Sequence, residues 1–318
     1  MPKRILDDQH TQDEQAILIF RVRRARLKAM KAAVAEALSL LAQYRPILLS
    51  GGPLGDQPGL FWLQMRESDI GSALDRLPLL GYSFAVDEVE FHECTAKRQK
   101  RKTVMQPTWR GHPFELKTLY NEDSDEFREQ APDRRGFLLQ IEEGSFKEVR
   151  GYRGDSGEFS RRGLPVSDAR LLANLAFVRE GGKFLDPFAG AGGVVLAGLG
   201  LKQEVFSLDV DPFVQWGLQH QGAQHCVGDA RYLPFRDNTF DGVASEAPFE
   251  ADAAALGDAM DEIARVLLPT GHAAIMVADH QACIVRERAR AGGLIPTLDL
   301  AIDRKGLNVI VLAWTKSS

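Results

Sequence analysis

The sequence predicts an α/β protein: a parallel sheet with helices on both faces, closed by a terminal β-hairpin and preceded by a small ferredoxin-like α+β unit. From residue 164 onward, apolar strand segments alternate with helical segments, a pattern typical of a parallel sheet between two helix layers. Two strand segments joined by a short turn end the chain. The first ninety or so residues instead follow the order strand, helix, strand, strand, helix, strand, which is the ferredoxin-like order.

Each element is predicted from its hydrophobic period and its flanking turn residues. In the first unit, the first helix ends before Pro46 and the second begins with acidic and serine residues. We expect strands there at 16–23, 47–50, 59–67 and 82–91, and helices at 26–44 and 67–81. In the second part we expect helices at 167–180, 193–200, 213–222, 252–268 and 281–293, and strands at 183–187, 204–210, 225–230, 241–247, 272–279, 294–303 and 306–316.

These patterns divide the chain into a ferredoxin-like N-terminal domain at 1–92, a basic linker with a hairpin at 93–163, and the α/β domain at 164–318. A length of 318 residues fits two domains, since single cores seldom exceed roughly 250 to 300 residues. The middle segment is rich in positive charge, at Lys97, Arg98, Lys100, Arg101, Lys102, Arg110, Arg134, Arg135, Arg150, Arg153, Arg161 and Arg162, with Trp109 among them.

Composition narrows the class of protein. A net charge of −5 means that any contact with nucleic acid requires a local basic patch such as the middle segment. The three cysteines, Cys94, Cys226 and Cys283, are far apart, and the seven histidines show no ligand spacing. We therefore expect no disulfide framework, no metal site and a cytoplasmic location. The chain shows neither an N-terminal apolar segment nor a run near the ~20 residues of a spanning helix, so we expect no signal peptide and no membrane contact.

The strongest local motif is Leu-Asp-Pro-Phe-Ala-Gly-Ala-Gly-Gly at 185–193, directly after a predicted strand. Glycines at this point let the backbone approach a ligand closely and let the next helix pack tightly. The dinucleotide fingerprint needs a third glycine where Val195 stands, and the Asp186 carboxylate would repel a pyrophosphate. The acid suits a cationic amino-acid group instead, which favours the methionine end of S-adenosyl-L-methionine. Without a ligand, the same residues would form a tight strand-to-helix turn.

Two further acids follow the next two strands. Asp209 ends the second strand, where a carboxylate can bind ribose hydroxyls, whereas Asp211 fits a helix cap better. After the third strand, Asp229 can accept a hydrogen bond from an adenine amine, and the Ala230 N–H can meet a ring nitrogen. Gly-Asp-Ala alone is common turn chemistry, but in register with Asp186 and Asp209 it indicates a nucleoside site.

Together these segments resemble class I S-adenosylmethionine-dependent methyltransferases, specifically the THUMP-associated tRNA guanine-N2 methyltransferases, over roughly residues 134 to 318. The motifs that carry the resemblance lie at 185–193, 207–211, 228–230 and 240–249, with an upstream segment at 160–176. The resemblance implies a Rossmann-like class I methyltransferase sheet, S-adenosyl-L-methionine as cofactor, and RNA, specifically tRNA, as partner. It implies cofactor contacts from Asp186, Phe188, Gly190, Gly192, Asp209, Asp229 and Ala230.

The acceptor motif departs from the family pattern. Amine methyltransferases carry Asp, Asn or Ser, then Pro-Pro and Tyr or Phe, after the fourth strand, whereas this chain has Glu246-Ala247-Pro248-Phe249. Glu246 can still accept an N–H of the target amine, and the Phe249 ring can still stack on a base. However, glutamate is one methylene longer and Ala247 replaces a rigid ring.

We therefore expect Glu246 and Phe249 to act in methyl transfer to an exocyclic base amine of RNA, specifically guanine N2 in tRNA. The basic segment from Lys97 to Lys102 and the arginine-rich hairpin would hold the RNA. Two alternatives are a small-molecule methyltransferase with an altered acceptor motif and a non-catalytic module that binds S-adenosylmethionine or RNA. The acidic net charge and the Glu-Ala-Pro-Phe motif favour these alternatives.

Overall fold

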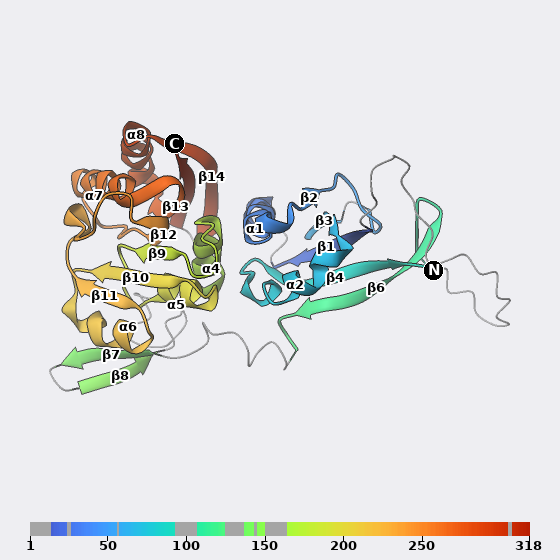
Figure 1. Ribbon diagram of the computed structural model, residues 1–318, viewed down its shortest axis with the longest axis horizontal. Helices are drawn as coiled ribbons and strands as arrows, with labels where there is room; N and C mark the ends of the chain where they lie inside the picture. The colour runs from blue at the N-terminus through green and yellow to red at the C-terminus, as the bar shows by residue number, and fades with distance from the viewer. Residues whose placement is uncertain are drawn as a thin grey trace. The chain divides into compact units, whose positions relative to one another are not determined.

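The computed structural model describes residues 14–23, 27–55, 57–92, 107–124, 137–142, 145–149, 164–304 and 307–318. The chain forms two compact units (Figure 1). The first comprises Met1–Pro78 and Ser83–Gln130, and the second comprises Leu79–Tyr82 and Ala131–Ser318. Each unit is built around its own sheet, so each is described separately.

Among its described residues, the first unit has a six-stranded antiparallel sheet and the helices α1 and α2. Its elements are β1 (Gln15–Val22), α1 (Leu27–Leu40), β2 (Ile47–Leu48), β3 (Leu60–Arg66), α2 (Glu67–Leu74), β4 (Ser83–Phe91), β5 (Thr108–Trp109) and β6 (His112–Asn121). The sheet order is β2-β3-β1-β4-β6-β5. The element order up to β4 is the expected one, and the assignment of this unit to the ferredoxin-like class stays a prediction.

One part of the predicted linker differs in the structure. β6 pairs antiparallel with β4 from Ala85–Asn121 to Phe91–Phe114, so these residues extend the first sheet. The reason is burial: Phe114 is fully buried in a cluster with Ile17, Ile19 and Trp62. β6 therefore buries an apolar side chain in the first sheet. The charged residues around it in the sequence had indicated a linker instead.

The second unit contains a seven-stranded sheet in the order β11-β10-β9-β12-β13-β15-β14. Strands β9 to β13 run parallel where they pair, and β15 runs antiparallel to both of its neighbours. The predicted α/β class and terminal hairpin are thus confirmed. The elements are α4 (Val166–Leu175), β9 (Lys183–Asp186), α5 (Gly193–Gly200), β10 (Glu204–Asp209), η5 (Pro212–Val214), α6 (Gln215–His220), β11 (Gln224–Val227), η6 (Ala230–Tyr232), β12 (Phe240–Glu246), α7 (Ala253–Val266), β13 (Leu267–Ala278), η7 (Asp279–Gln281), α8 (Ala282–Ala291), β14 (Leu294–Arg304) and β15 (Leu307–Lys316).

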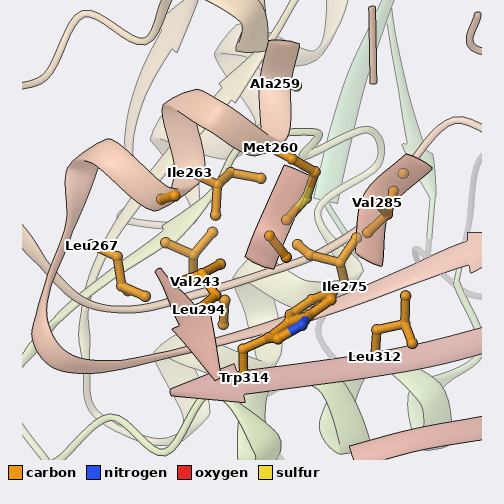
Figure 2. Close-up of a cluster of buried hydrophobic side chains, with 14 of the residues drawn as sticks. Val243, Ala259, Met260, Ile263, Leu267, Ile275, Val285, Leu294, Leu312 and Trp314 are labelled. Atoms are coloured by element: carbon orange, nitrogen blue, oxygen red, sulfur yellow. The ribbon is translucent and has the colours of Figure 1, made fainter. Parts of the chain in front are cut away.

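Strand alternation gives this sheet two apolar faces, each covered by helices. On one face, side chains of α7 and α8 pack over the central strands, as Figure 2 shows for Met260, Ile263, Val285, Val243, Ile275 and Trp314. On the other face, Phe184 lies against α5, where a Cβ on Gly198 would come within 2.9 Å of the ring. Burying side chains of this size contributes roughly 1.5 to 3 kcal/mol each, which makes the sheet a rigid base for the loops at its edge.

A separate hairpin is formed by β7 (Phe137–Glu142) and β8 (Ser145–Val149). β7 lies against α6 and η5, close to where β10 ends. The basic run from Lys97 to Lys102 and the arginines around the hairpin lie outside the described residues. Among the helices that the structure describes, none combines the length and apolarity that crossing a bilayer would require.

Candidate active site

The candidate site lies at the carboxyl ends of the parallel strands in the second unit. β9 sits between β10 and β12, so the chain order reverses on its two sides. Ligands of open α/β sheets bind at such a reversal, because the loops leave the sheet in opposite directions there. The glycine motif follows β9, Asp209 ends β10, and Glu246 ends β12. The fold therefore brings these predicted residues to one edge.

The glycine loop needs backbone that other residues rarely adopt. Gly190 has φ of 47° and Gly192 has φ of 85°, both in the left-handed region. Gly192 precedes α5, and a Cβ there would lie 2.7 Å from the Leu218 side chain. The loop thus turns directly from β9 into the helix through backbone that favours glycine, which is the tight turn that the motif predicted.

Asp209 fixes this loop to the neighbouring strand. One carboxylate oxygen accepts the Gly190 N–H at 2.7 Å, and the other accepts the Asp211 N–H at 2.9 Å. Asp211 in turn caps the helical turn after β10 by accepting the Phe213 N–H at 3.0 Å, which confirms its expected role as a cap. Because each carboxylate oxygen has two lone pairs, Asp209 keeps acceptor capacity for ribose hydroxyls.

Asp186 is a buried residue. It is 1% exposed, and its Oδ1 accepts the Ser245 hydroxyl at 2.5 Å and the Phe188 N–H at 3.3 Å. The pKa of Asp186 is raised to about 7: burial is the largest cause, the two hydrogen bonds lower the pKa, and the negative charges of Asp209 and Glu246 raise it. A cation placed beside this carboxyl would stabilise its charged form.

Asp229 is already paired in the structure. Its carboxylate accepts the Arg231 N–H at 2.9 Å and binds the Arg231 guanidinium, with Nη2 2.6 Å from Oδ2. The Arg231 side chain therefore lowers the pKa of Asp229. Ala230 is 3% exposed and begins η6. An adenine amine would have to share Asp229 with this exposed arginine.

The acceptor motif follows β12. Glu246 and Phe249 are both half-buried, and the Ala247 N–H donates to the Met276 carbonyl at 2.9 Å. The Gln281 side-chain amide, fully buried, donates to the carbonyls of Pro248 at 2.9 Å and Ala251 at 3.2 Å. These hydrogen bonds from Gln281, a residue of η7, hold the loop after Glu246 in place.

The chemistry of this edge fits S-adenosylmethionine. A charged Asp186 carboxyl suits the cationic amino-acid end, and the carboxylate of Asp209, whose charge acts on Asp186, suits the ribose hydroxyls. Val210 and Val227, at the ends of β10 and β11, are 67% and 43% exposed and offer apolar surface for an aromatic ring. The other residues predicted to contact the cofactor lie in or beside the loops at this edge, and their contacts stay predictions. They are Phe188, Gly190, Gly192, Asp229 and Ala230.

Ser245, Gln281 and Arg231 have roles that the sequence did not predict. No local motif marks either Ser245 or Gln281, and Gln281 is 33 residues from Pro248. Arg231 follows Asp229 by two residues, so the motif itself could have suggested that pairing. Within the described ranges, no group of three or more His, Cys, Asp or Glu side chains is arranged to hold a metal ion.

Comparison with known proteins agrees with this geometry. Residues 185–275 match a family model described as a methyltransferase domain. A 112-residue stretch is 32% identical to a tRNA (guanine(10)-N2)-dimethyltransferase of Methanothermobacter thermautotrophicus, covering 33% of this chain and 33% of that protein. The chain thus matches about a third of that relative's length.

Two solved structures are similar to part of the chain. A protein of Pyrococcus horikoshii is 18% identical with a TM-score of 0.39, covering 43% of this chain and 82% of that one. A TehB-like S-adenosylmethionine-dependent methyltransferase of Corynebacterium glutamicum is 23% identical with a TM-score of 0.39, covering 46% and 86%. Residues 185–275 of the second unit match a methyltransferase domain, and S-adenosylmethionine is its cofactor.

Proposed function

We propose that this methyltransferase domain transfers a methyl group to an exocyclic base amine of RNA, specifically to guanine N2 in tRNA. The observation that carries the proposal is the position of Glu246 at the carboxyl end of β12. Glu246 is close enough to Asp186, at the cofactor edge, for its negative charge to raise the pKa of Asp186. A carboxylate there can accept an amine N–H directly beside the bound cofactor. Phe249, three residues on and half-buried, can stack on the base.

The substrate class is supported by the relative named as a tRNA guanine-N2 dimethyltransferase, although the match covers one third of its length. We extend its substrate to this chain as part of the proposal. We also propose that the basic run from Lys97 to Lys102 and the arginine-rich hairpin contact the RNA backbone, since phosphate contacts need clustered cations in a chain of net charge −5. A cytoplasmic location belongs to the same proposal.

The residues of the chain would orient and deprotonate the amine. When bound, the cofactor supplies a methyl group on a positively charged sulfur. Glu246 accepts one N–H of the amine and aims the nitrogen lone pair, while Phe249 holds the base plane. Methyl transfer from the bound cofactor to the amine nitrogen would leave that nitrogen with a proton to lose, and the Glu246 carboxylate would accept this proton. No net charge is left on the base.

The test is transfer of labelled methyl from S-adenosylmethionine to unmodified tRNA, followed by mass analysis of the nucleosides. We expect N2-methylguanosine from the wild type and a loss of about 100-fold or more in kcat for Glu246→Ala, because a transition-state hydrogen bond is removed. Glu246→Gln keeps an acceptor of the same length and should retain part of the rate. Phe249→Ala should weaken tRNA binding by roughly 1 to 3 kcal/mol.

Cofactor affinity is the control, since neither change should alter it much. Activity that survives both alanine substitutions would remove these residues from the acceptor site. The Glu-Ala-Pro-Phe motif specifically favours a second candidate, transfer to a small molecule, because the family's rigid proline is absent at Ala247. Labelling of a metabolite pool but not of tRNA would establish that candidate, and cofactor binding with no transfer to either would indicate a non-catalytic module.

A further inference from the structure

Ser245 occupies an unusual position between the cofactor edge and the acceptor motif. β12 pairs with β9 at Gly242–Phe184 and Val243–Leu185, then continues past the end of β9 to Glu246. Ser245 therefore stands beside Asp186, where β9 gives way to the glycine loop. Both side chains are buried, at 0% and 1% exposure.

The two hydrogen bonds to Asp186 are unequal. The Ser245 hydroxyl donates to Oδ1 at 2.5 Å, whereas the Phe188 N–H donates to the same oxygen at 3.3 Å, at the long end of the range for such bonds. Of the two bonds, the one from Ser245 also does more to lower the pKa of Asp186. Ser245 is thus the principal donor that orients this carboxyl.

We infer that Ser245 is a positioning residue of the cofactor site, whose hydroxyl holds the buried Asp186 carboxylate in place for the cationic amino-acid end of S-adenosylmethionine. The inference rests on the proposed role of Asp186 at the cofactor and not on the identity of the methyl acceptor. Because Ser245 directly precedes Glu246, the same strand end then serves both the cofactor and the acceptor sides of the site.

Burial and the charges around Asp186 explain why such a donor is needed. Burial is the largest cause that raises the pKa of Asp186, and the negative charges of Asp209 at the end of β10 and Glu246 at the end of β12 raise it too. The Ser245 hydroxyl opposes them by lowering this pKa. Loss of the hydroxyl should therefore raise the pH at which Asp186 becomes charged and able to hold a cation.

The experiment is calorimetric binding of S-adenosylhomocysteine, which carries the same amino-acid end, from about pH 6 to pH 9. We expect Ser245→Ala to weaken binding about tenfold relative to wild type near pH 6 and little near pH 9, since a hydrogen bond to a charged group shifts a pKa by roughly one unit. Titration of the ligand's own ionisable groups affects the wild type and the variant equally, so it cancels in the ratio of their affinities. Ser245→Thr, which keeps a hydroxyl, should restore much of the wild-type profile.

Ser207→Ala is the matched control. Ser207 is also a fully buried strand serine, it is the register partner of Asp186 on β10, and its hydroxyl bonds to His225 Nδ1 at 2.9 Å instead. It should lose comparable stability and keep the wild-type pH profile of binding. If Ser245→Ala weakens binding by the same factor at every pH, or behaves as Ser207→Ala does, the inference is overturned.

Asp186→Asn separates this inference from the cofactor role on which it rests. The asparagine amide keeps an oxygen that can accept the Ser245 hydroxyl, but it has no proton to lose. Ligand binding should therefore weaken, and the part of its pH dependence that comes from residue 186 should disappear. In that background, Ser245→Ala should add no further pH dependence. If Asp186→Asn binds as the wild type does, Asp186 is not a cofactor residue, and this outcome also overturns the inference. Should Ser245→Ala fail to fold, the Ser245→Cys variant, nearly isosteric but a weak donor, takes its place with the same expectation.

Discussion

Gln281 offers a direct test of how the acceptor loop is held. Its side-chain oxygen accepts the Ala278 N–H at 3.0 Å, and its amide donates to the carbonyls of Pro248 and Ala251 at 2.9 and 3.2 Å. The side chain is fully buried, so water cannot replace these partners without opening the loop. Gln281→Met keeps the volume and removes all three bonds.

The magnitude follows from these contacts. A net loss of about 1 kcal/mol for each hydrogen bond gives a loss of about 3 kcal/mol in the free energy of unfolding. Two of the three bonds go to the loop, so its local opening should become about 2 kcal/mol easier, which corresponds to roughly thirtyfold faster exchange of its amide hydrogens. Methyl transfer should fall with cofactor affinity unchanged.

The assay is urea unfolding together with hydrogen exchange of peptides that cover residues 247–251. Gln203→Met is the control, because Gln203 is 6% exposed and donates one bond, to the Val178 carbonyl at 3.2 Å, away from this loop. It should cost about 1 kcal/mol of stability and leave exchange in the loop unaltered. Equal loop exchange in wild type and Gln281→Met would refute the idea that this amide pins the acceptor motif.

Three further predictions concern the acids of the cofactor edge. Because the folded-state pKa of Asp186 is raised to about 7, the folded protein holds a proton that the unfolded chain releases, and stability should decline as pH rises from about 4 to about 7. Asp186→Asn, measured by urea unfolding, should remove that decline and make the protein more stable than the wild type at pH 8. Asp209→Ala leaves two backbone N–H groups without their acceptor and should lower the free energy of unfolding by about 2 to 4 kcal/mol and weaken cofactor binding in calorimetry. Arg231→Ala frees the Asp229 carboxylate, so its pKa, followed by NMR, should rise toward the ordinary value, and cofactor affinity should increase by less than about tenfold.

The sequence by itself determined the order of the elements and the nature of the cofactor edge. Alternating apolar segments predicted the strands and helices from β9 to β15, and the structure confirms the terminal hairpin, which places β15 antiparallel between β13 and β14. The glycines predicted the tight turn into α5, with Gly190 and Gly192 at positive φ. These features are local, because hydrophobic period and backbone freedom act over a few residues.

Only the tertiary structure decided which side chains meet. Ser245 bonds to Asp186 across 59 residues of sequence, Gln281 reaches the acceptor loop across 33, and Asp209 ties down the glycine loop across 19. β6 likewise joined the first sheet instead of remaining a linker. Each of these contacts depends on strand order and register, which are set by burial of whole faces and by the pairing of distant strands. The hydrophobic pattern of one segment does not specify which other segment lies beside it in the sheet. Contacts between distant residues therefore could not be predicted from the sequence and are known only from the structure.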